Sequence, residues 1–243
     1  MKRIVLLLLS LAPLAFAAST PATKSAPPVA KEFAPIVDDP KLPRVLIIGD
    51  SVSVAYTLDV RKNLAGVANV HRIPTNGGST RTALGEYGLI RWLKPGEKWD
   101  VIHFNEGLHD LSYRFPDDRD KNDKGEYASP TNGGRPNVSV EQYEKNLRLI
   151  VARLKQTGAK LIWTSTTPIP DNPAQKQTAA SVIEKNALAA EVMKKHGIPT
   201  DDLFSAMTPR LAEFQPPLDV HFTGAGYDFL GATVGEAILS RLK

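Results

Sequence analysis

The 243-residue chain contains no cysteine, which excludes disulfide bonds, lipid-modified cysteines and zinc sites that use thiolate ligands. It also lacks an unbroken apolar run of the roughly 18 to 20 residues that a membrane-spanning helix needs. Its 30 basic and 26 acidic residues are scattered, without a basic cluster interleaved with aromatics, so we expect no nucleic-acid partner. What remains is an ordinary globular composition, 42% hydrophobic and 23% charged, for which one domain is the default.

The first 43 residues differ from the rest. Residues 1–17 combine Lys2 and Arg3 with an apolar stretch and a small-residue ending, the pattern of a secretory signal cleaved after Ala17. Residues 18–43 are rich in Ala, Pro, Ser and Thr, which predicts a flexible spacer. We therefore expect a folded domain over residues 44–243 in an exported protein, periplasmic or secreted. We also expect it to be a monomer that keeps no stable membrane anchor after cleavage.

Strand-like and helical patterns alternate along the predicted domain. Strands are expected at 44–49, 69–74, 100–105 and 160–166, with a short extended segment at 198–203, and helices at 53–64, 80–93, 139–157, 173–196 and 225–242. Such alternation implies right-handed crossovers and a parallel sheet between helices. We therefore predict an α/β fold with three layers, α/β/α, and about five parallel strands.

The first candidate for chemistry follows the first strand. Residues 45–48 (VLII) form a branched apolar run typical of a strand buried on both faces of a parallel sheet. Gly49 permits a tight turn, Asp50 can cap the next helix, and Ser51 then lies near a helix N-terminus that favours negative charge. Ser51 is a candidate nucleophile, although the tripeptide taken alone favours a simple turn with a serine near a helix cap.

Two further segments fall where strands are expected to end. Residues 76–80 (NGGST) carry glycines whose backbone N–H groups can approach an oxyanion closely. Residues 103–110 (HFNEGLHD) gather polar side chains just beyond an apolar run, and burying them without purpose would be costly. Both segments are therefore candidates for an acyl-transfer site.

A last segment, residues 217–223 (PLDVHFT), precedes the final helix. Asp219 and His221 are two residues apart, and in an extended segment such side chains point the same way. Asp219 could then accept a hydrogen bond from one ring nitrogen of His221, while the other nitrogen takes the Ser51 proton.

Together these blocks resemble the SGNH (GDSL-type) hydrolases, a family of serine esterases with a flavodoxin-like fold. The resemblance covers roughly residue 44 to the C-terminus. It implies Ser51 as nucleophile, His221 as base and Asp219 as the partner that orients it. It also implies that the N–H groups of Ser51 and Gly78 stabilise an oxyanion, since residues 78–80 (GST) fit the family's Gly-x-Thr pattern. No cofactor is implied.

Two features depart from the family pattern. Residues 107–110 read GLHD where the family has Gly-x-Asn-Asp, so the third oxyanion donor is either His109 or Asn105. The aspartate and histidine of the last block are two residues apart instead of three, which leaves Asp202 as a conceivable substitute. The GLHD block with the DVHF block is similar to a branch of exported bacterial enzymes.

The remaining histidines have simpler interpretations. His71 and His196 favour structural or exposed roles, and His103, on the strand face of Asn105, favours packing. His103 could gather a metal with His109 and His221, but the seryl mechanism already uses the latter two, so we expect no metal site.

The loop at 112–137 is polar, with a few aromatics. It is either a mobile, solvated excursion or an element that overhangs the site and shapes specificity. In the second case we expect Tyr113 and Phe115 to contact substrate. The sequence thus predicts an exported serine esterase acting on short-chain esters, for example acetyl groups on carbohydrates. A sugar O-acyltransferase and a catalytically silent carbohydrate-binding relative are the alternatives.

Overall fold

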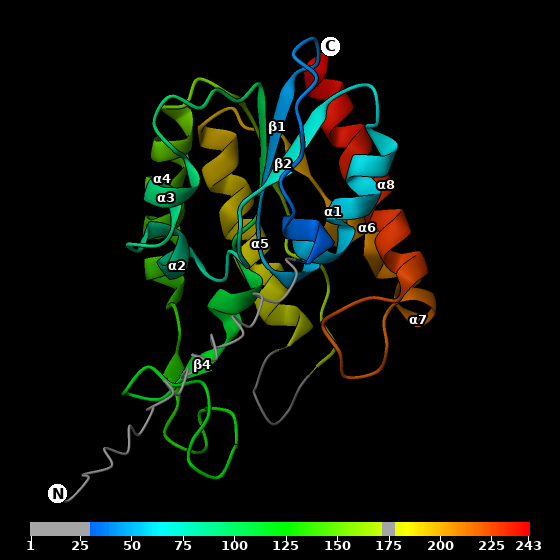
Figure 1. Ribbon diagram of the computed structural model, residues 1–243. Helices are drawn as coiled ribbons and strands as arrows, with labels where there is room; N and C mark the ends of the chain where they lie inside the picture. Colours follow the sequence, from blue (N-terminus) through cyan, green and yellow to red (C-terminus); the bar gives the residue numbers. More distant parts are fainter. Residues whose placement is uncertain (1–29, 172–177) are drawn as a thin grey trace, which may run out of the picture.

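The computed structural model describes residues 30–171 and 178–243 (Figure 1). Its centre is a parallel sheet with the strand order β2-β1-β3-β6-β7, which confirms the predicted sheet. The strands are β1 (Arg44–Ile48), β2 (Asn69–Arg72), β3 (Val101–Phe104), β6 (Lys160–Thr164) and β7 (Thr200–Asp201). Within the described ranges, no helix has the length and apolar character that a membrane crossing requires.

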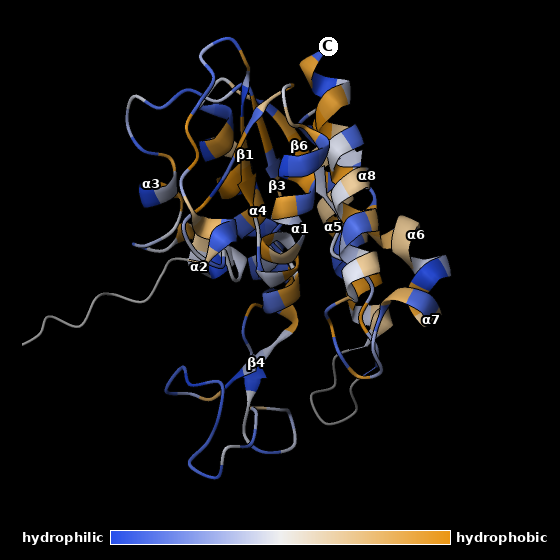
Figure 2. Cartoon of the chain, turned by 45° about the vertical axis from the view of Figure 1, so that its right-hand side comes forward, coloured by the Kyte–Doolittle hydropathy of each residue, from blue (hydrophilic) through white to orange (hydrophobic). Residues whose placement is uncertain are grey.

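Helices cover both faces of the sheet, which confirms the three-layer α/β/α prediction (Figure 1). One face carries α1 (Ser51–Asn63) and α8 (Gly224–Leu242), and the other carries α2 (Thr80–Leu84), α3 (Leu89–Trp92), α4 (Val140–Lys155) and α5 (Ala179–Lys195). Strand β1 alternates between the two cores: Val45 and Ile47 pack toward α1 and α8, whereas Leu46 and Ile48 pack toward α4. Figure 2 shows this apolar interior between more polar outer helix faces.

The strand order places a topological switch between β1 and β3. From β1 the chain turns outward to β2, then crosses back to β3 on the other side of β1. In open parallel sheets, the carboxyl ends of the strands beside such a switch form a crevice that receives the ligand. The Gly-Asp-Ser turn follows β1 and the HFNEGLHD segment spans the end of β3, so both meet at this crevice.

The structure corrects several local predictions. The helix expected at 80–93 is two helices, α2, which ends at the C-cap Gly85, and α3, which begins after the N-cap Gly88. Glycine is required at residue 88, since an added Cβ would lie 2.1 Å from the Ala83 carbonyl oxygen. The helix expected from 173 is α5, which begins at Ala179, and residues 172–177 lie outside the described residues. Short elements that were not expected are η1 (Lys31–Phe33), η2 (Leu108–Leu111), β4 (Tyr113–Arg114), β5 (Arg135–Pro136), α6 (Leu203–Met207), η3 (Thr208–Arg210) and α7 (Leu211–Phe214).

The chain ahead of β1 packs on the domain. The Arg61 guanidinium donates to the Lys31 carbonyl, 3.2 Å away, and Asp38 accepts from Arg44 at 2.7 Å and contacts the His71 ring at 2.6 Å. Residues 30–43 therefore belong to the folded unit, and the predicted domain boundary at Arg44 is corrected accordingly. The predicted signal peptide and residues 18–29 lie outside the described residues and stay predictions.

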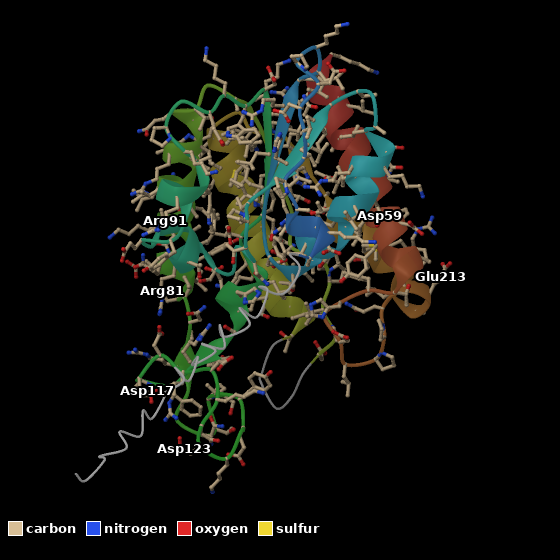
Figure 3. All side chains as sticks on the ribbon, viewed as in Figure 1. Asp59, Arg81, Arg91, Asp117, Asp123 and Glu213 are labelled. Atoms are coloured by element: carbon tan, nitrogen blue, oxygen red, sulfur yellow. The ribbon has the colours of Figure 1, made fainter. Side chains whose placement is uncertain are left out.

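Two glycines of α8 make a test of the packing between α1 and α8. A Cβ at Gly231 would lie 2.4 Å from the Asp59 Cβ, whereas one at Gly235 would lie an ordinary 3.5 Å from the Asn63 Cβ (Figure 3 labels Asp59). We expect Gly231→Ala to lower the free energy of unfolding by about 1 to 3 kcal/mol, because the helices must move apart. Gly235→Ala should be neutral or stabilising by up to about 1 kcal/mol, since alanine favours helix. Urea unfolding of both variants measures this, and equal stability would contradict the close approach.

Candidate active site

Ser51 is the first residue of α1, in the tight connection from β1. Asp50 caps the helix, its Oδ1 accepting from the Val52 N–H at 3.0 Å. The Ser51 N–H lies in the first turn, where a helix has no internal acceptor for it. Burial raises the pKa of the Asp50 carboxyl, and the nearby His109 partly opposes that rise. The turn thus presents a hydroxyl and an N–H at a helix N-terminus.

Ser51, His221 and Asp219 form a hydrogen-bonded chain. The Ser51 Oγ lies 3.0 Å from His221 Nε2, and His221 Nδ1 lies 2.8 Å from Asp219 Oδ1. Hydrogen bonds from the His221 backbone N–H and from its ring hold the pKa of Asp219 below its usual value, so the carboxylate is an acceptor. Nδ1 then carries the ring hydrogen, and Nε2 is free to accept the Ser51 proton.

The segment that carries Asp219 and His221 is a turn rather than the extended chain that the sequence suggested. Leu218 has a φ of 59°, and Asp219 Oδ1 accepts from the His221 backbone N–H at 3.0 Å as well as contacting its ring. The two-residue spacing is therefore accommodated by an aspartate that bends back over the chain. Asp202, the conceivable substitute, instead caps α6 and accepts from the Ser165 and Ser205 hydroxyls.

The glycine loop after β2 reaches the nucleophile turn. The Gly77 N–H donates to the Gly49 carbonyl at 2.9 Å, so it is already committed. Gly78 has a φ of +72°, a left-handed conformation that favours glycine. Its N–H donates to Asn76 Oδ1 at 2.9 Å, on the exposed side of the loop. A ligand oxygen at this position must share that N–H with the Asn76 side chain or replace it.

Asn105 and His109, the two candidates for the third oxyanion donor, have different surroundings. The Asn105 amide donates to the Thr164 carbonyl at 2.7 Å and to Thr166 Oγ1 at 3.4 Å, and the residue is only 8% exposed. Its side chain therefore ties β3 to the end of β6. His109 lies in η2 and lines a cavity together with Ser51 and His221.

His103 is fully buried in β3 and pairs with Asp201 of β7 across the sheet, Nε2 to Oδ2, at 2.9 Å. It therefore does not lie with His109 and His221 in a common ligand set. In the part of the chain that the structure describes, no group of three or more His, Asp or Glu side chains is arranged to hold a metal.

The cavity at Ser51 has a volume of about 310 Å³. Ser51, His109 and His221 line it, and residues of the 112–137 excursion form one wall. Tyr113 is among these wall residues, whereas Phe115 is not among the residues that line the cavity. A hollow of about 370 Å³ lies at the opposite, amino end of the strands, where Trp99 precedes β3, and no member of the Ser-His-Asp chain lines it. The chemistry and the space for a ligand thus coincide at the carboxyl end of the sheet.

The whole of this arrangement falls within one family pattern. The model of the GDSL-like lipase/acylhydrolase family matches residues 47–229. The chain belongs to this family. The resemblance to GDSL-type hydrolases is thereby confirmed, and the chain is an enzyme of the class that hydrolyses ester bonds.

Solved structures of similar fold include three ester hydrolases. A lipase/acylhydrolase from Enterococcus faecalis has 24% identity and a TM-score of 0.61, covering 83% of this chain and 97% of its own. The acetyl xylan esterase AlAXEase has 12% identity and a TM-score of 0.59, covering 80% and 99%. Axe2, an acetylxylan esterase from Geobacillus stearothermophilus, has 17% identity and a TM-score of 0.57, covering 82% and 94%. No curated protein sequence matches the chain significantly.

Sequence reasoning missed Arg72, a buried arginine at the end of β2. Its guanidinium donates to the carbonyls of Gly49, at 3.3 Å, and Thr75, at 3.1 Å, as well as to the hydroxyls of Ser53 and Thr57. Burial lowers its pKa to about 10, so it remains charged at neutral pH. Arg72 thus joins the nucleophile turn to the glycine loop. An arginine at the end of a predicted buried strand, directly before Ile73, was the available signal.

Asp110, the last residue of the GLHD block, holds the other side of the glycine loop. It accepts from the Thr80 backbone N–H at 2.9 Å and from the Thr80 hydroxyl, which also receives the Asn146 amide at 3.0 Å. Burial raises the pKa of Asp110 to about 6. The aspartate therefore fixes the N-terminus of α2 relative to η2 and His109.

Glu106 is a buried acid directly behind this site. It is 0% exposed, and neither carboxyl oxygen has a hydrogen-bond partner among the described residues. A Cβ at Gly77 would lie 3.0 Å from Glu106 Oε1, which places the acid against the glycine loop. Burial, reinforced by Asp110 and Asp50, raises the pKa of Glu106 well above 4.5, so the neutral acid is the favoured form.

This raised pKa predicts a pH-dependent stability. Above pH 4.5 the unfolded chain loses the Glu106 proton while the folded protein keeps it, so the free energy of unfolding falls as pH rises toward the folded-state pKa. Glu106→Gln cannot titrate, so it should not show this part of the decline. Between pH 4.5 and pH 8 its free energy of unfolding should therefore fall by at least about 1 kcal/mol less than that of the wild type. Urea unfolding across this range measures it, with exposed Glu141→Gln as the control for a lost charge. Parallel profiles for wild type and Glu106→Gln would contradict the assignment.

Proposed function

We propose that the protein is an exported serine esterase that hydrolyses short-chain esters, acetyl esters of carbohydrates above all. Ser51 is the nucleophile, His221 the general base and Asp219 the carboxylate that orients it. The observation that carries the proposal is the continuous chain from Ser51 Oγ through the His221 ring to Asp219, at 3.0 and 2.8 Å, on the floor of a cavity. A hydroxyl within hydrogen-bond reach of an oriented imidazole is the arrangement of an activated nucleophile.

The reaction follows from this geometry. Ser51 Oγ forms a bond to the ester carbonyl carbon while its proton passes to His221 Nε2. The carbon–oxygen bond to the alcohol then breaks, the alcohol leaves with that proton, and the acyl group stays on Ser51. Water attacks the acyl-enzyme, giving one proton to His221. The acid departs as the Ser51 oxygen recovers this proton.

Three donors face the carbonyl oxygen in this proposal: the N–H groups of Ser51 and Gly78 and the ring of His109. The substrate oxygen takes over the Gly78 N–H from the Asn76 side chain. His109 is preferred to Asn105 because the Asn105 amide already donates to Thr164 and Thr166, whereas His109 lines the cavity. Fixed donors aimed at developing charge act most strongly when they need no rearrangement.

The cavity supports a small acyl group. Its apolar lining is short, consisting of Leu108, Ala128 and Val220, with polar or aromatic side chains elsewhere. A long acyl chain would leave much of its length in water. Two of the solved structures of similar fold are acetyl xylan esterases, which agrees with an acetyl ester of a carbohydrate as substrate.

Replacing Ser51 tests the nucleophile. Ser51→Ala should lower kcat for 4-nitrophenyl acetate by at least about 10³-fold, because the triad acts as a unit. A fluorophosphonate should add once to the wild-type protein, at Ser51 by peptide mapping, and not to the variant. Ser53→Ala, which removes the hydroxyl two residues further along α1, should keep the label. A wild-type protein with neither label nor turnover would favour the catalytically silent binding protein instead.

Separate alanine substitutions distinguish the rival donors. His109→Ala should lower kcat by about 10² to 10³-fold with little change in the free energy of unfolding, because an oxyanion donor acts on the transition state. Asn105→Ala should lower the free energy of unfolding by about 1 to 3 kcal/mol, since two buried acceptors lose their donor. Steady-state kinetics and urea unfolding measure both effects. A stable Asn105→Ala that loses the activity while His109→Ala keeps it would reverse the assignment.

A further inference from the structure

The excursion at residues 112–137 is an ordered element attached beside His109. The Asn137 amide and the Ser112 hydroxyl both donate to the His109 carbonyl, at 2.9 and 2.8 Å, and the Asn137 N–H donates to the Ser112 carbonyl at 2.8 Å. These contacts close the base of the excursion on η2. It extends beyond the carboxyl end of the sheet, below the domain in Figure 1.

Internal contacts give the excursion a defined shape. Strands β4 and β5 pair antiparallel, Lys121 bridges to Tyr127, and the Ala128 N–H donates to the Asp120 carbonyl at 2.9 Å. A half-exposed ion pair between Arg81 of α2 and Asp118 adds a further contact between the excursion and the domain. Figure 3 shows Asp117 and Asp123 on this excursion, with Arg81 on the domain above it. The excursion can therefore present side chains at fixed positions.

Six residues of the excursion line the cavity that contains Ser51, and the four with long side chains are Tyr113, Arg114, Asp120 and Tyr127. Tyr127 is 51% exposed as a residue, and Lys121 Nζ lies over one face of its ring, 4.3 Å from the centroid. With Lys121 on one face, the other face of the Tyr127 ring is a flat apolar surface. Such a surface suits a ligand whose own flat face is apolar and whose edge carries polar groups. Pyranose rings have this character.

The charges of the wall favour a neutral ligand. Arg114 and Asp120 carry opposite charges, and Lys121 lies over the Tyr127 ring without lining the cavity, so the side chains that line the wall add no net charge. A guanidinium supplies hydrogen-bond donors only and a carboxylate supplies acceptors only, and hydroxyl groups can satisfy both. An anionic sugar would meet the Asp120 carboxylate, and a cationic one would meet Arg114.

We propose that the wall formed by Tyr113, Arg114, Asp120 and Tyr127 is a subsite for the alcohol part of the ester, and that it binds a neutral pyranose. The ring packs on Tyr127 while its hydroxyls bond to Arg114 and Asp120. The acyl group then lies on the side of Leu108 and Val220, next to Ser51. This subsite rests on the proposed function and adds the side chains that select the alcohol.

Kinetics on three acetates tests the subsite: 4-nitrophenyl acetate, a mono-acetylated methyl glycoside of a neutral pyranose, and the same glycoside with a carboxylate at C5. Tyr127→Ala should lower kcat/KM for the neutral glycoside by roughly tenfold through a raised KM and change the aryl acetate less than about twofold. Tyr87→Ala is the matched control, an exposed tyrosine that packs on Arg91 away from the cavity. Wild type should prefer the neutral glycoside to the carboxylate by roughly tenfold or more.

Equal losses on the aryl and glycoside esters would assign Tyr127 a structural role and overturn the proposal, as would a preference for the carboxylate-bearing glycoside.

A binding measurement distinguishes failure of the subsite from failure of the proposed esterase chemistry. Titration calorimetry of Ser51→Ala with the neutral glycoside ester should show binding that the added Tyr127→Ala change weakens by roughly tenfold. That result would support the subsite even if the wild-type protein turned over no ester. Unchanged affinity in the double variant would overturn it.

Discussion

The hydrogen bond from the Gly77 N–H to the Gly49 carbonyl is the contact on which the candidate site depends. It joins the loop after β2 to the turn after β1, and Arg72 reinforces it by donating to the carbonyls of Gly49 and Thr75 from below. With these loops fixed, the Ser51 and Gly78 N–H groups keep a set separation. The Ser51 N–H has no acceptor within its helix, whereas the Gly78 N–H must be released by the Asn76 side chain before it can bind the proposed oxyanion.

The structure maintains these loops with polar groups that would be costly to bury elsewhere. Arg72 and Asp110 are each satisfied by several partners, so their burial is offset by hydrogen bonds. Glu106 is different, because its two oxygens have no hydrogen-bond partner within the described ranges, and its neutral form is the one that the interior tolerates. The region behind the candidate site thus loses stability as pH rises above the ordinary pKa of a glutamate.

The sequence was sufficient for the sheet and for the position of Ser51, because apolar strand runs and a Gly-Asp-Ser turn are local signals. It was insufficient where tertiary contacts decide. The close approach of Gly88, the N-cap of α3, to the Ala83 carbonyl is such a contact. The preference that we propose for His109 over Asn105 likewise depends on the Thr164 carbonyl of β6, about 60 residues from Asn105 in sequence. The Asp219 and His221 pair was found for an incorrect local reason, since the chain turns there instead of running straight.

The attachment of the 112–137 excursion joins the proposed alcohol subsite to the proposed oxyanion donor His109 in one stretch of chain. The carbonyl of His109 accepts from Ser112 and Asn137 at the base of the excursion, while the His109 ring faces the cavity. Asp110, the next residue, is bonded to Thr80 at the start of α2. The excursion is therefore hydrogen-bonded to η2 at its base, and η2 is hydrogen-bonded on its other side to the residue that follows the glycine loop. The proposed alcohol subsite and the proposed third oxyanion donor therefore share one hydrogen-bonded stretch of chain, in which Ser112 and Asn137 hold the His109 backbone from one side and Asp110 holds Thr80 on the other.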